Sequence, residues 1–250
     1  MASSDIKDHV VLVAGAASGI GREITKNLIA KGAIVAACDK NLAALKSLRD
    51  DLANQSLHTF EIDFLDDSSI KECIDEVESK LGPLKAAINC VGVLGKNGER
   101  VELIDLDDFD LVYRINLRGA LVFTKAIIGG MAARGYGRIL HLSSISGKEG
   151  NPLLVAYSAT KAGLIGLVKS VGKEYATTGV TINAMAPALV QSPMTDSFSE
   201  SQLTYLKSRI PMNRLGEVSE AAEMAAWIIS PACSFTTGFA FDLSGGRATY

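Results

Sequence analysis

The sequence has little of what nucleic-acid binding or disulfide bonding requires. It carries 25 basic against 28 acidic residues, a net charge of −3 over 250 residues. Nucleic-acid binders carry a basic surplus, so we expect no nucleic-acid partner. The four cysteines, Cys38, Cys73, Cys90 and Cys233, form no closely spaced pair. We therefore expect reduced thiols and a cytoplasmic protein.

Other absences narrow the class further. The histidines His9, His58 and His141 are far apart and form no HExxH pattern, so no metal site is expected. Residues 1–8 lack the basic and apolar regions of a signal peptide. No uninterrupted apolar run is long enough to span a bilayer, so we expect no membrane partner. What the chain does have is 48% hydrophobic residues, enough for a large core.

Short apolar runs alternate with segments of helical spacing along the whole chain. This alternation predicts βαβ units and a parallel sheet covered on both faces. The fold class is therefore α/β, a doubly wound Rossmann-type sheet forming one domain over 1–250. The segment 190–215 is long for a connection, and we expect it to be a substrate lid with short helices. Strands are predicted over 9–14, 33–38, 58–62, 85–90, 138–142, 181–186 and 239–243, and helices over 19–31, 42–53, 68–80, 107–134 and 155–177.

A glycine-rich turn follows the first predicted strand. Gly15, Gly19 and Gly21, with Ser18 and Ile20 between them, lead directly into a predicted helix. Glycine lets backbone approach a pyrophosphate, and the helix N-terminus offers free N–H groups. A tight turn without a ligand is the alternative. The strand before and the helix after favour a dinucleotide site.

An acidic residue, Asp39, ends the second predicted strand, 18 residues after Gly21. In a dinucleotide fold such a residue accepts hydrogen bonds from the adenosine ribose hydroxyls. It also repels a 2′-phosphate, which favours NAD over NADP. A solvated aspartate that caps the next helix is the alternative.

Tyr157 and Lys161 are four residues apart in a predicted helix and so lie on one face. A nearby ammonium favours the phenolate, and a tyrosine so placed can exchange a proton with a carbonyl or alcohol oxygen. An ordinary surface pair is the alternative. Ser144 follows the strand over 138–142 on the ligand side of the sheet, although chemistry alone does not separate it from Ser143. Asn116 lies inside a predicted helix, where an amide needs either exposure or a task.

Together these motifs resemble the short-chain dehydrogenase/reductase family over essentially the whole chain. The matching segments are AGAASGIG (14–21), Asp39, Asp63 in DFLD, NCVG (89–92), Asn116 in INLRG, LSSISG (142–147), YSATK (157–161), NAMAPALVQSPM (183–194) and FDLSGG (241–246).

The resemblance implies an NAD-dependent oxidoreductase that interconverts secondary alcohols and ketones. It assigns Tyr157 as the acid/base, Ser144 as the hydroxyl that orients the substrate oxygen, and Lys161 to the nicotinamide ribose. Asn116 would shape a proton relay that starts at Lys161. The resemblance places seven further residues against the cofactor: Asp63 and Phe64 at the adenine, Asn89 and Gly92 at the adenosine, and Pro187, Val190 and Ser192 at the nicotinamide.

The substrate is a small molecule whose identity the motifs leave open. The segment SISGKEGNP and the ending SGGRATY resemble family members that oxidise sugar-derived hydroxy acids or polyols, the leading hypothesis. A 3-hydroxyacyl or 3-oxoacyl thioester or a cyclic alcohol is the alternative, and a non-catalytic NAD-sensing protein a remote one. Lys148, which could bind a substrate carboxylate, and Asn151 are the candidate substrate contacts, with a solvated loop charge the alternative for Lys148. The resemblance also implies a homotetramer.

Overall fold

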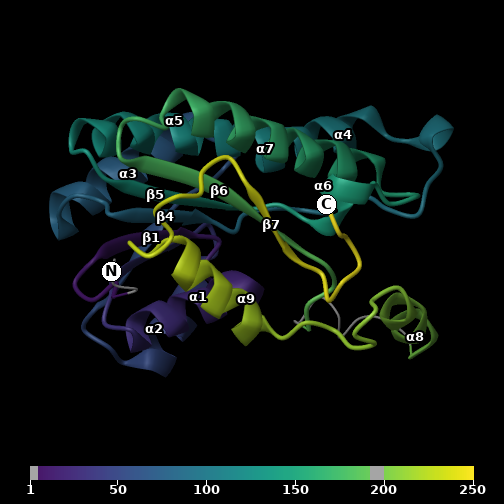
Figure 1. Ribbon diagram of the computed structural model, residues 1–250, viewed down its shortest axis with the longest axis horizontal. Coiled ribbons are helices and arrows are strands. Elements are labelled where there is room, and N and C mark those ends of the chain that lie inside the picture. The colour runs from purple at the N-terminus through teal and green to yellow at the C-terminus, as the bar shows by residue number, and fades with distance from the viewer. Residues whose placement is uncertain (1–4, 192–199) are drawn as a thin grey trace.

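A single parallel sheet runs through the residues that the computed structural model describes, 5–191 and 200–250. Its seven strands follow the order β3-β2-β1-β4-β5-β6-β7 (Figure 1). The order changes direction between β1 and β4, which is the topological switch point of a doubly wound sheet. The strands are β1 Val10–Ala14, β2 Ile34–Asp39, β3 Leu57–Glu61, β4 Ala86–Asn89, β5 Gly137–Leu142, β6 Val180–Pro187 and β7 Ala240–Leu243.

Helices cover both faces of the sheet. Figure 1 shows α1, α2 and α9 on one side and α3, α4, α5 and α7 on the other. The α-helices are α1 Gly19–Ala30, α2 Leu42–Leu52, α3 Asp67–Leu81, α4 Leu106–Tyr113, α5 Gly119–Ala133, α6 Ile145–Glu149, α7 Val155–Glu174, α8 Glu200–Ser208 and α9 Val218–Ile228. The predicted α/β fold class, a doubly wound sheet with helices on both faces, is confirmed.

The first strand shows why these apolar runs become central strands. Val11 and Val13 point into one core, where they meet Ile24 of α1. Leu12 points into the opposite core, which includes Phe123 of α5. All five side chains are fully buried. A strand buried on both faces has no polar side to display, so its sequence reads as a continuous apolar run.

The helix expected over 107–134 is interrupted in the structure. Between α4 and α5, residues Arg114–Arg118 form a π-helical segment, η2. Such segments are rare and are frequently found at functional sites. Asn116 lies in the middle of η2 and is 1% exposed. Its side-chain amide is therefore buried, and it makes hydrogen bonds with the backbone of Val93.

The span Leu106–Ala133 is long and apolar enough to cross a membrane by length and composition. Half of its apolar window is nevertheless buried inside the molecule. Phe123, Ile127 and Met131 belong to the core on that side of the sheet. Packing against the sheet thus accounts for much of the apolar character of this span.

Two short helices lie at the carboxyl edge of the strands, one of which the sequence did not predict. α6 begins directly after Ser144, whose side chain accepts a hydrogen bond from the Ser146 amide and caps the helix. α8 lies within the segment 190–215 expected to be a lid. Residues 192–199 of that segment are outside the described residues, and its role as a lid stays a prediction.

Candidate active site

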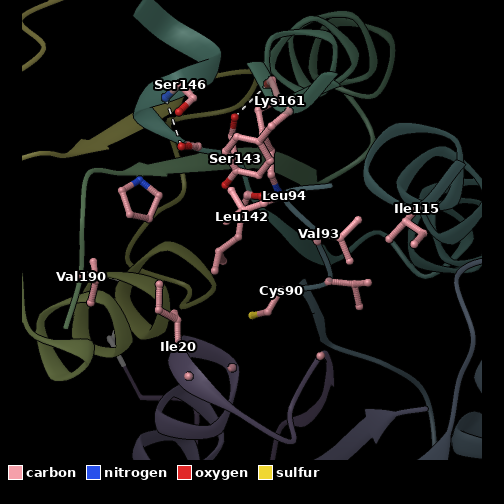
Figure 2. Close-up of a pocket in the computed structure, with 18 of the residues that line it drawn as sticks. Ile20, Cys90, Val93, Leu94, Ile115, Leu142, Ser143, Ser146, Lys161 and Val190 are labelled. Carbon is pink, nitrogen blue, oxygen red and sulfur yellow. Dashed lines mark hydrogen bonds between the residues drawn. The ribbon is translucent and has the colours of Figure 1, made fainter. Parts of the chain in front are cut away.

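A cavity of about 710 Å³ lies at the carboxyl edge of the strands. Ile20 of α1 and Lys161 of α7 approach it from opposite sides (Figure 2). Segments far apart in the sequence therefore share one space, as expected at the switch point of a doubly wound sheet. The predicted residues that line it are Gly15, Ser18, Gly19, Ile20, Gly21, Asp39, Asp63, Phe64, Gly92, Ser144, Asn151, Tyr157, Lys161, Pro187 and Val190.

The turn after β1 requires its glycines. Gly15 and Gly19 adopt φ of 77° and 52°, in the left-handed region that favours glycine. A Cβ on Gly21 would lie 2.1 Å from the Gly15 carbonyl oxygen. The Arg22 amide donates to the Ser18 carbonyl at 3.1 Å, while helix geometry leaves the preceding amides of the first turn outside the helical ladder. The turn thus fits a phosphate group: bare backbone lines the cavity beside a helix N-terminus.

The Asp39 carboxylate is fixed at the end of β2. Its Oδ2 accepts a hydrogen bond from the Ala17 amide at 3.1 Å, and its Oδ1 accepts one from the Asn41 amide at 3.0 Å. The first of these bonds ties Asp39 to the glycine turn. The carboxylate therefore lines the same cavity wall as the turn, as acceptance of ribose hydroxyls requires.

The wall beyond Asp39 is formed by Asp63 and Phe64. The Asp63 Oδ1 accepts a hydrogen bond from the Leu65 amide at 2.9 Å. Phe64 is 3% exposed and packs against Phe123 with 5.8 Å between ring centroids. Both residues line the cavity and follow β3, the strand next to β2, which ends at Asp39. This polar and aromatic wall fits the adenine end of a dinucleotide.

Ser143 and Ser144 have different environments, which separates the two candidates left open by sequence. The Ser143 hydroxyl donates to the Lys161 carbonyl oxygen at 2.9 Å. The Ser144 hydroxyl lies close enough to the Tyr157 hydroxyl to lower the pKa of Tyr157 by hydrogen bonding. It also accepts from the Ser146 amide at 3.1 Å. Ser144 is thus the serine placed to act on an oxygen held by Tyr157.

Tyr157 and Lys161 lie on one face of α7, as their spacing predicts. Burial raises the pKa of the Tyr157 hydroxyl, and its hydrogen bond with Ser144 lowers that pKa in part. Burial lowers the pKa of the Lys161 ammonium to about 8. The Lys161 Nζ donates to the Leu142 carbonyl at 2.7 Å and lies 5.6 Å from the Tyr157 ring centroid. The ammonium thus lies beside the Tyr157 ring, and its expected lowering of the Tyr157 pKa stays a prediction.

The Lys161 ammonium has room because residue 92 is glycine. A Cβ on Gly92 would lie 2.9 Å from the Lys161 Nζ and 3.5 Å from the Asn116 Oδ1. Asn116 in turn holds the loop after Gly92. Its Oδ1 accepts from the Val93 amide at 2.8 Å, and its Nδ2 donates to the Val93 carbonyl at 2.9 Å. Asn116 is not among the cavity-lining residues, so it acts behind the wall and next to Lys161.

Comparisons with known proteins agree with this geometry. A family model described as enoyl-(acyl carrier protein) reductase matches residues 15–247. A 2-dehydro-3-deoxy-L-rhamnonate dehydrogenase (NAD(+)) from Sphingomonas sp. (strain SKA58) is 40% identical over 239 residues, 96% of this chain and 95% of that protein. The chain belongs to the short-chain dehydrogenase/reductase family.

Two further relatives of this short-chain dehydrogenase/reductase cover nearly all of it. A 3-oxoacyl-[acyl-carrier-protein] reductase FabG from Thermotoga maritima is 32% identical over 244 residues, 96% of this chain and 98% of that protein. The crystal structure of gox2181 superposes with a TM-score of 0.93 at 25% identity, over 98% and 97% of the two chains. The chain is thus an oxidoreductase of this family over its full fold.

Three further residues that the sequence analysis singled out lie away from the cavity wall or outside the described residues. Asn89 is 1% exposed, and its Nδ2 lies 3.2 Å from the His141 Nδ1. Its Oδ1 accepts from the Val91 amide at 2.9 Å, so it shapes the loop behind the wall. The Lys148 Nζ lies 3.2 Å from the Asp242 Oδ2, and Lys148 is not a cavity-lining residue. Ser192 lies outside the described residues.

One charged residue of the short-chain dehydrogenase/reductase cavity was not predicted from the sequence. Arg247 lines the cavity beside Asn151, although 86 residues separate it from Lys161 in sequence. Its Nη2 donates to the Asn151 Oδ1 at 2.9 Å. The ending SGGRATY contains this arginine, but nothing in its spacing indicates that it returns to the site.

Proposed function

We propose that this protein is an NAD(H)-dependent dehydrogenase that interconverts a secondary alcohol and a ketone in a sugar-derived hydroxy acid or polyol. The observation that carries the proposal is the placement of Ser144 and Tyr157 on the cavity that the glycine turn and Asp39 also line. A nicotinamide bound there would supply the hydride acceptor or donor. The side chains supply the proton chemistry.

The proton steps follow from the contacts of the chain's own residues. During oxidation the Tyr157 oxygen accepts the proton of the substrate hydroxyl, while the Ser144 hydroxyl holds the same substrate oxygen. Burial opposes formation of the phenolate, and the Ser144 hydrogen bond favours it. Lys161 carries the neighbouring positive charge, and its pKa of about 8 lets it exchange protons near neutral pH.

The preference for NAD rests on Asp39. Its carboxylate is held by the Ala17 and Asn41 amides, so it does not swing away from the ribose position. A 2′-phosphate placed there meets a fixed negative charge. Lys40 lines the same wall and is exposed, so its flexible ammonium offsets this repulsion only in part. The 40% identical Sphingomonas relative, whose name specifies NAD(+), supports the same cofactor.

The relatives also define the competing substrate class. The Sphingomonas relative is named for a sugar acid, and the Thermotoga relative for a 3-oxoacyl thioester on a carrier protein. The higher identity to the first supports a hydroxy acid, with the thioester as the alternative. Both share the secondary alcohol and ketone chemistry that Tyr157 performs.

A substrate panel in parallel with NAD and NADP tests this proposal. We expect turnover of sugar-derived hydroxy acids or polyols with NAD, and at least about tenfold lower kcat/KM with NADP. Hydroxyacyl thioesters and cyclic alcohols are the comparison arms. Turnover of the thioesters alone would assign the alternative, and NAD reduction by none of the compounds would contradict the dehydrogenase activity.

The Tyr157→Phe variant separates catalysis from binding in the same panel. The substitution removes the hydroxyl but keeps the ring that fills the cavity wall. We expect turnover to fall by about 10³-fold or more, while the Kd for NAD, measured by fluorescence titration, changes by less than about threefold. NAD binding in the absence of any turnover by the unmodified protein would support an NAD-sensing role instead.

We propose in addition a cytoplasmic homotetramer that binds neither nucleic acid nor membranes. The four cysteines are free thiols, as a reducing compartment favours. α4 and α5 expose apolar side chains, including Leu106 at 75% and Leu121 at 49%, and pairing of these helices across a two-fold axis would bury them. Light scattering that gives the mass of a monomer would contradict this assembly.

A further inference from the structure

Residues 244–250 form a strap that returns from β7 to the active site. Figure 1 shows this segment leaving the edge of the sheet and ending beside α6. The Gly245 carbonyl accepts a hydrogen bond from the Met212 amide at 3.1 Å, and the Tyr250 hydroxyl donates to the Lys148 carbonyl of α6. These contacts fasten the strap on both sides of Arg247. The arginine is therefore held in place by the fold.

The Arg247 side chain is fixed on one edge of its guanidinium. Its Nε donates to the Glu149 Oε2 at 3.0 Å, and its Nη2 lies 2.9 Å from the same oxygen. The Nη2 also donates to the Asn151 Oδ1 at 2.9 Å. Asn151 is fixed in turn, because its Nδ2 donates to the Ser146 Oγ at 2.7 Å. The Arg247 side chain is 9% exposed, so it is both oriented and largely desolvated.

The Nη1 nitrogen is the part of the guanidinium that remains for a ligand. Among residues 5–191, 200 and 203–250, none accepts a hydrogen bond from the Arg247 Nη1. Arg247 lines the cavity that Tyr157 also lines, whereas Glu149 does not, so the carboxylate that holds the arginine lies behind it. A group bound in the cavity thus meets a cation with two unused N–H donors.

The other charged groups around the cavity are engaged elsewhere or belong to the adenosine wall. Lys148, the cation that the sequence suggested, pairs with Asp242 away from the cavity. Lys161 donates to the Leu142 carbonyl beside Tyr157. The acidic lining residues, Asp39 and Asp63, belong to the wall that fits the adenosine. The described part of the substrate region therefore presents Arg247, Asn151 and apolar side chains such as Leu153.

We propose that Arg247 is the anchor for the carboxylate of the substrate, with Glu149 and Asn151 as the positioning residues that hold its guanidinium. The inference rests on the proposed dehydrogenase function and narrows the substrate to hydroxy acids and their keto acids. A carboxylate oxygen can accept from the Nη1 N–H groups, because Nε and Nη2 are already bonded to Glu149 and Asn151. Glu149 already neutralises part of the charge of Arg247, which favours a monoanionic carboxylate over a phosphate dianion.

A charged and a neutral form of one compound test the anchor. The probes are 2-dehydro-3-deoxy-L-rhamnonate and its primary amide, which differ only at the carboxylate. We expect Arg247→Met to lower kcat/KM for the acid by roughly 100-fold and for the amide by less than about threefold. Arg247→Lys should recover part of the loss for the acid, because it restores the charge without the planar fork.

Arg209→Met is the matched control for loss of a nearby positive charge. Arg209 is exposed, its charge interacts with that of Glu149, and it is not a cavity-lining residue. We expect kcat/KM of this variant to stay within about threefold for both probes. Thermal melting of all variants identifies any substitution at Arg247 that loosens the strap. Equal losses for acid and amide in Arg247→Met would overturn the carboxylate anchor and assign Arg247 a structural role.

Binding to an inactive protein keeps this test separate from the proposed function. Calorimetry of the acid and of the amide with NAD-loaded Tyr157→Phe needs no turnover. Tighter binding of the acid, lost when Arg247→Met is added, supports the anchor even if the unmodified protein oxidises a different hydroxy acid. Equal affinity for acid and amide, or no binding of the acid, overturns it, and a dehydrogenase of neutral polyols would then stand.

Discussion

Two adjacent hydroxyl groups show how closely the chemistry depends on single contacts. Ser144 hydrogen-bonds Tyr157 and lowers its pKa against the effect of burial. Ser143, one residue earlier, donates instead to the Lys161 backbone. A phenolate buried in this site depends on hydrogen-bond donors for its stability. The contribution of each serine to the pH dependence of catalysis should therefore differ.

We predict that Ser144→Ala moves the rising limb of the pH profile for alcohol oxidation to higher pH. Removal of the Ser144 hydrogen bond leaves burial as the remaining effect on the Tyr157 pKa, so that pKa increases. Oxidation needs the deprotonated tyrosine, and activity at a given pH below that pKa falls. We expect a loss in kcat/KM of about 10²-fold at pH 7, measured from pH 6 to 10.

Ser143→Ala is the matched control for this profile. Its hydroxyl contacts a backbone carbonyl of α7 and does not act on the Tyr157 oxygen. We expect its rising limb to coincide with that of the unmodified protein. If Ser143→Ala shifted the limb and Ser144→Ala did not, the assignment of Ser144 would be wrong.

At the scale of elements, the turn from β1 into α1 is built around missing side chains. A Cβ at position 21 would lie 2.1 Å from the Gly15 carbonyl oxygen. The backbone would have to move to relieve this clash. Movement of this turn displaces the helix N-terminus that faces the cavity. The binding of a pyrophosphate depends on those amides.

We therefore predict that Gly21→Ala weakens NAD binding by about tenfold or more and lowers the free energy of unfolding by about 1–3 kcal/mol. Gly129→Ala in α5 is the control, because a Cβ there meets nothing within 4 Å. It should leave NAD binding unchanged and raise the free energy of unfolding by up to about 1 kcal/mol. NAD titration and urea unfolding of both variants check this. Unchanged NAD affinity in Gly21→Ala would contradict the role of the turn.

The elements also show which parts of the fold and of the candidate site sequence patterns can predict. The central strands are apolar on both faces, so their runs stand out, and the glycines, Asp39 and Tyr157 occupy fixed positions relative to them. The π-helical segment at Asn116 is less visible, because apolar spacing continues through it. The helix α6 is equally difficult to predict from the sequence. It has five residues, and a Cβ on its Gly147 would lie 2.6 Å from the Lys161 backbone, so packing against α7 sets its place.

Arg247 marks the limit of prediction from sequence in the candidate site. Its position depends on the path of the strap across the edge of the sheet, which is a property of the whole fold. The Tyr250 contact with α6 and the Glu149 contact with Arg247 join segments about 100 residues apart. Lys148 was predicted to contact the substrate because it follows Ser144 closely in sequence. In α6, however, its ammonium pairs with the Asp242 carboxylate. A position close to Ser144 in sequence therefore did not place Lys148 in the cavity. The positive charge in the cavity comes instead from Arg247, which the fold brings back from the end of the chain.

At the scale of the molecule, the cavity joins both halves of the sheet. Its walls come from the turn after β1, the ends of β2, β4, β5 and β6, the helix α7 and the strap. A dinucleotide that spans this cavity would contact both sides of the switch point at once. Such a ligand binds the folded state and not the unfolded chain, so it stabilises the fold by mass action.

We predict that NAD at about 100 times its Kd raises the free energy of unfolding by about 2.7 kcal/mol and the melting temperature by roughly 5–10 °C. NADP at the same concentration should give a much smaller shift, because its 2′-phosphate meets the fixed Asp39 carboxylate. Asp39→Ser should reduce the shift with NAD and increase the shift with NADP. Asp75→Ser, on an exposed position of α3, should change neither. Equal shifts with NAD and NADP in the unmodified protein would show that Asp39 does not select the cofactor.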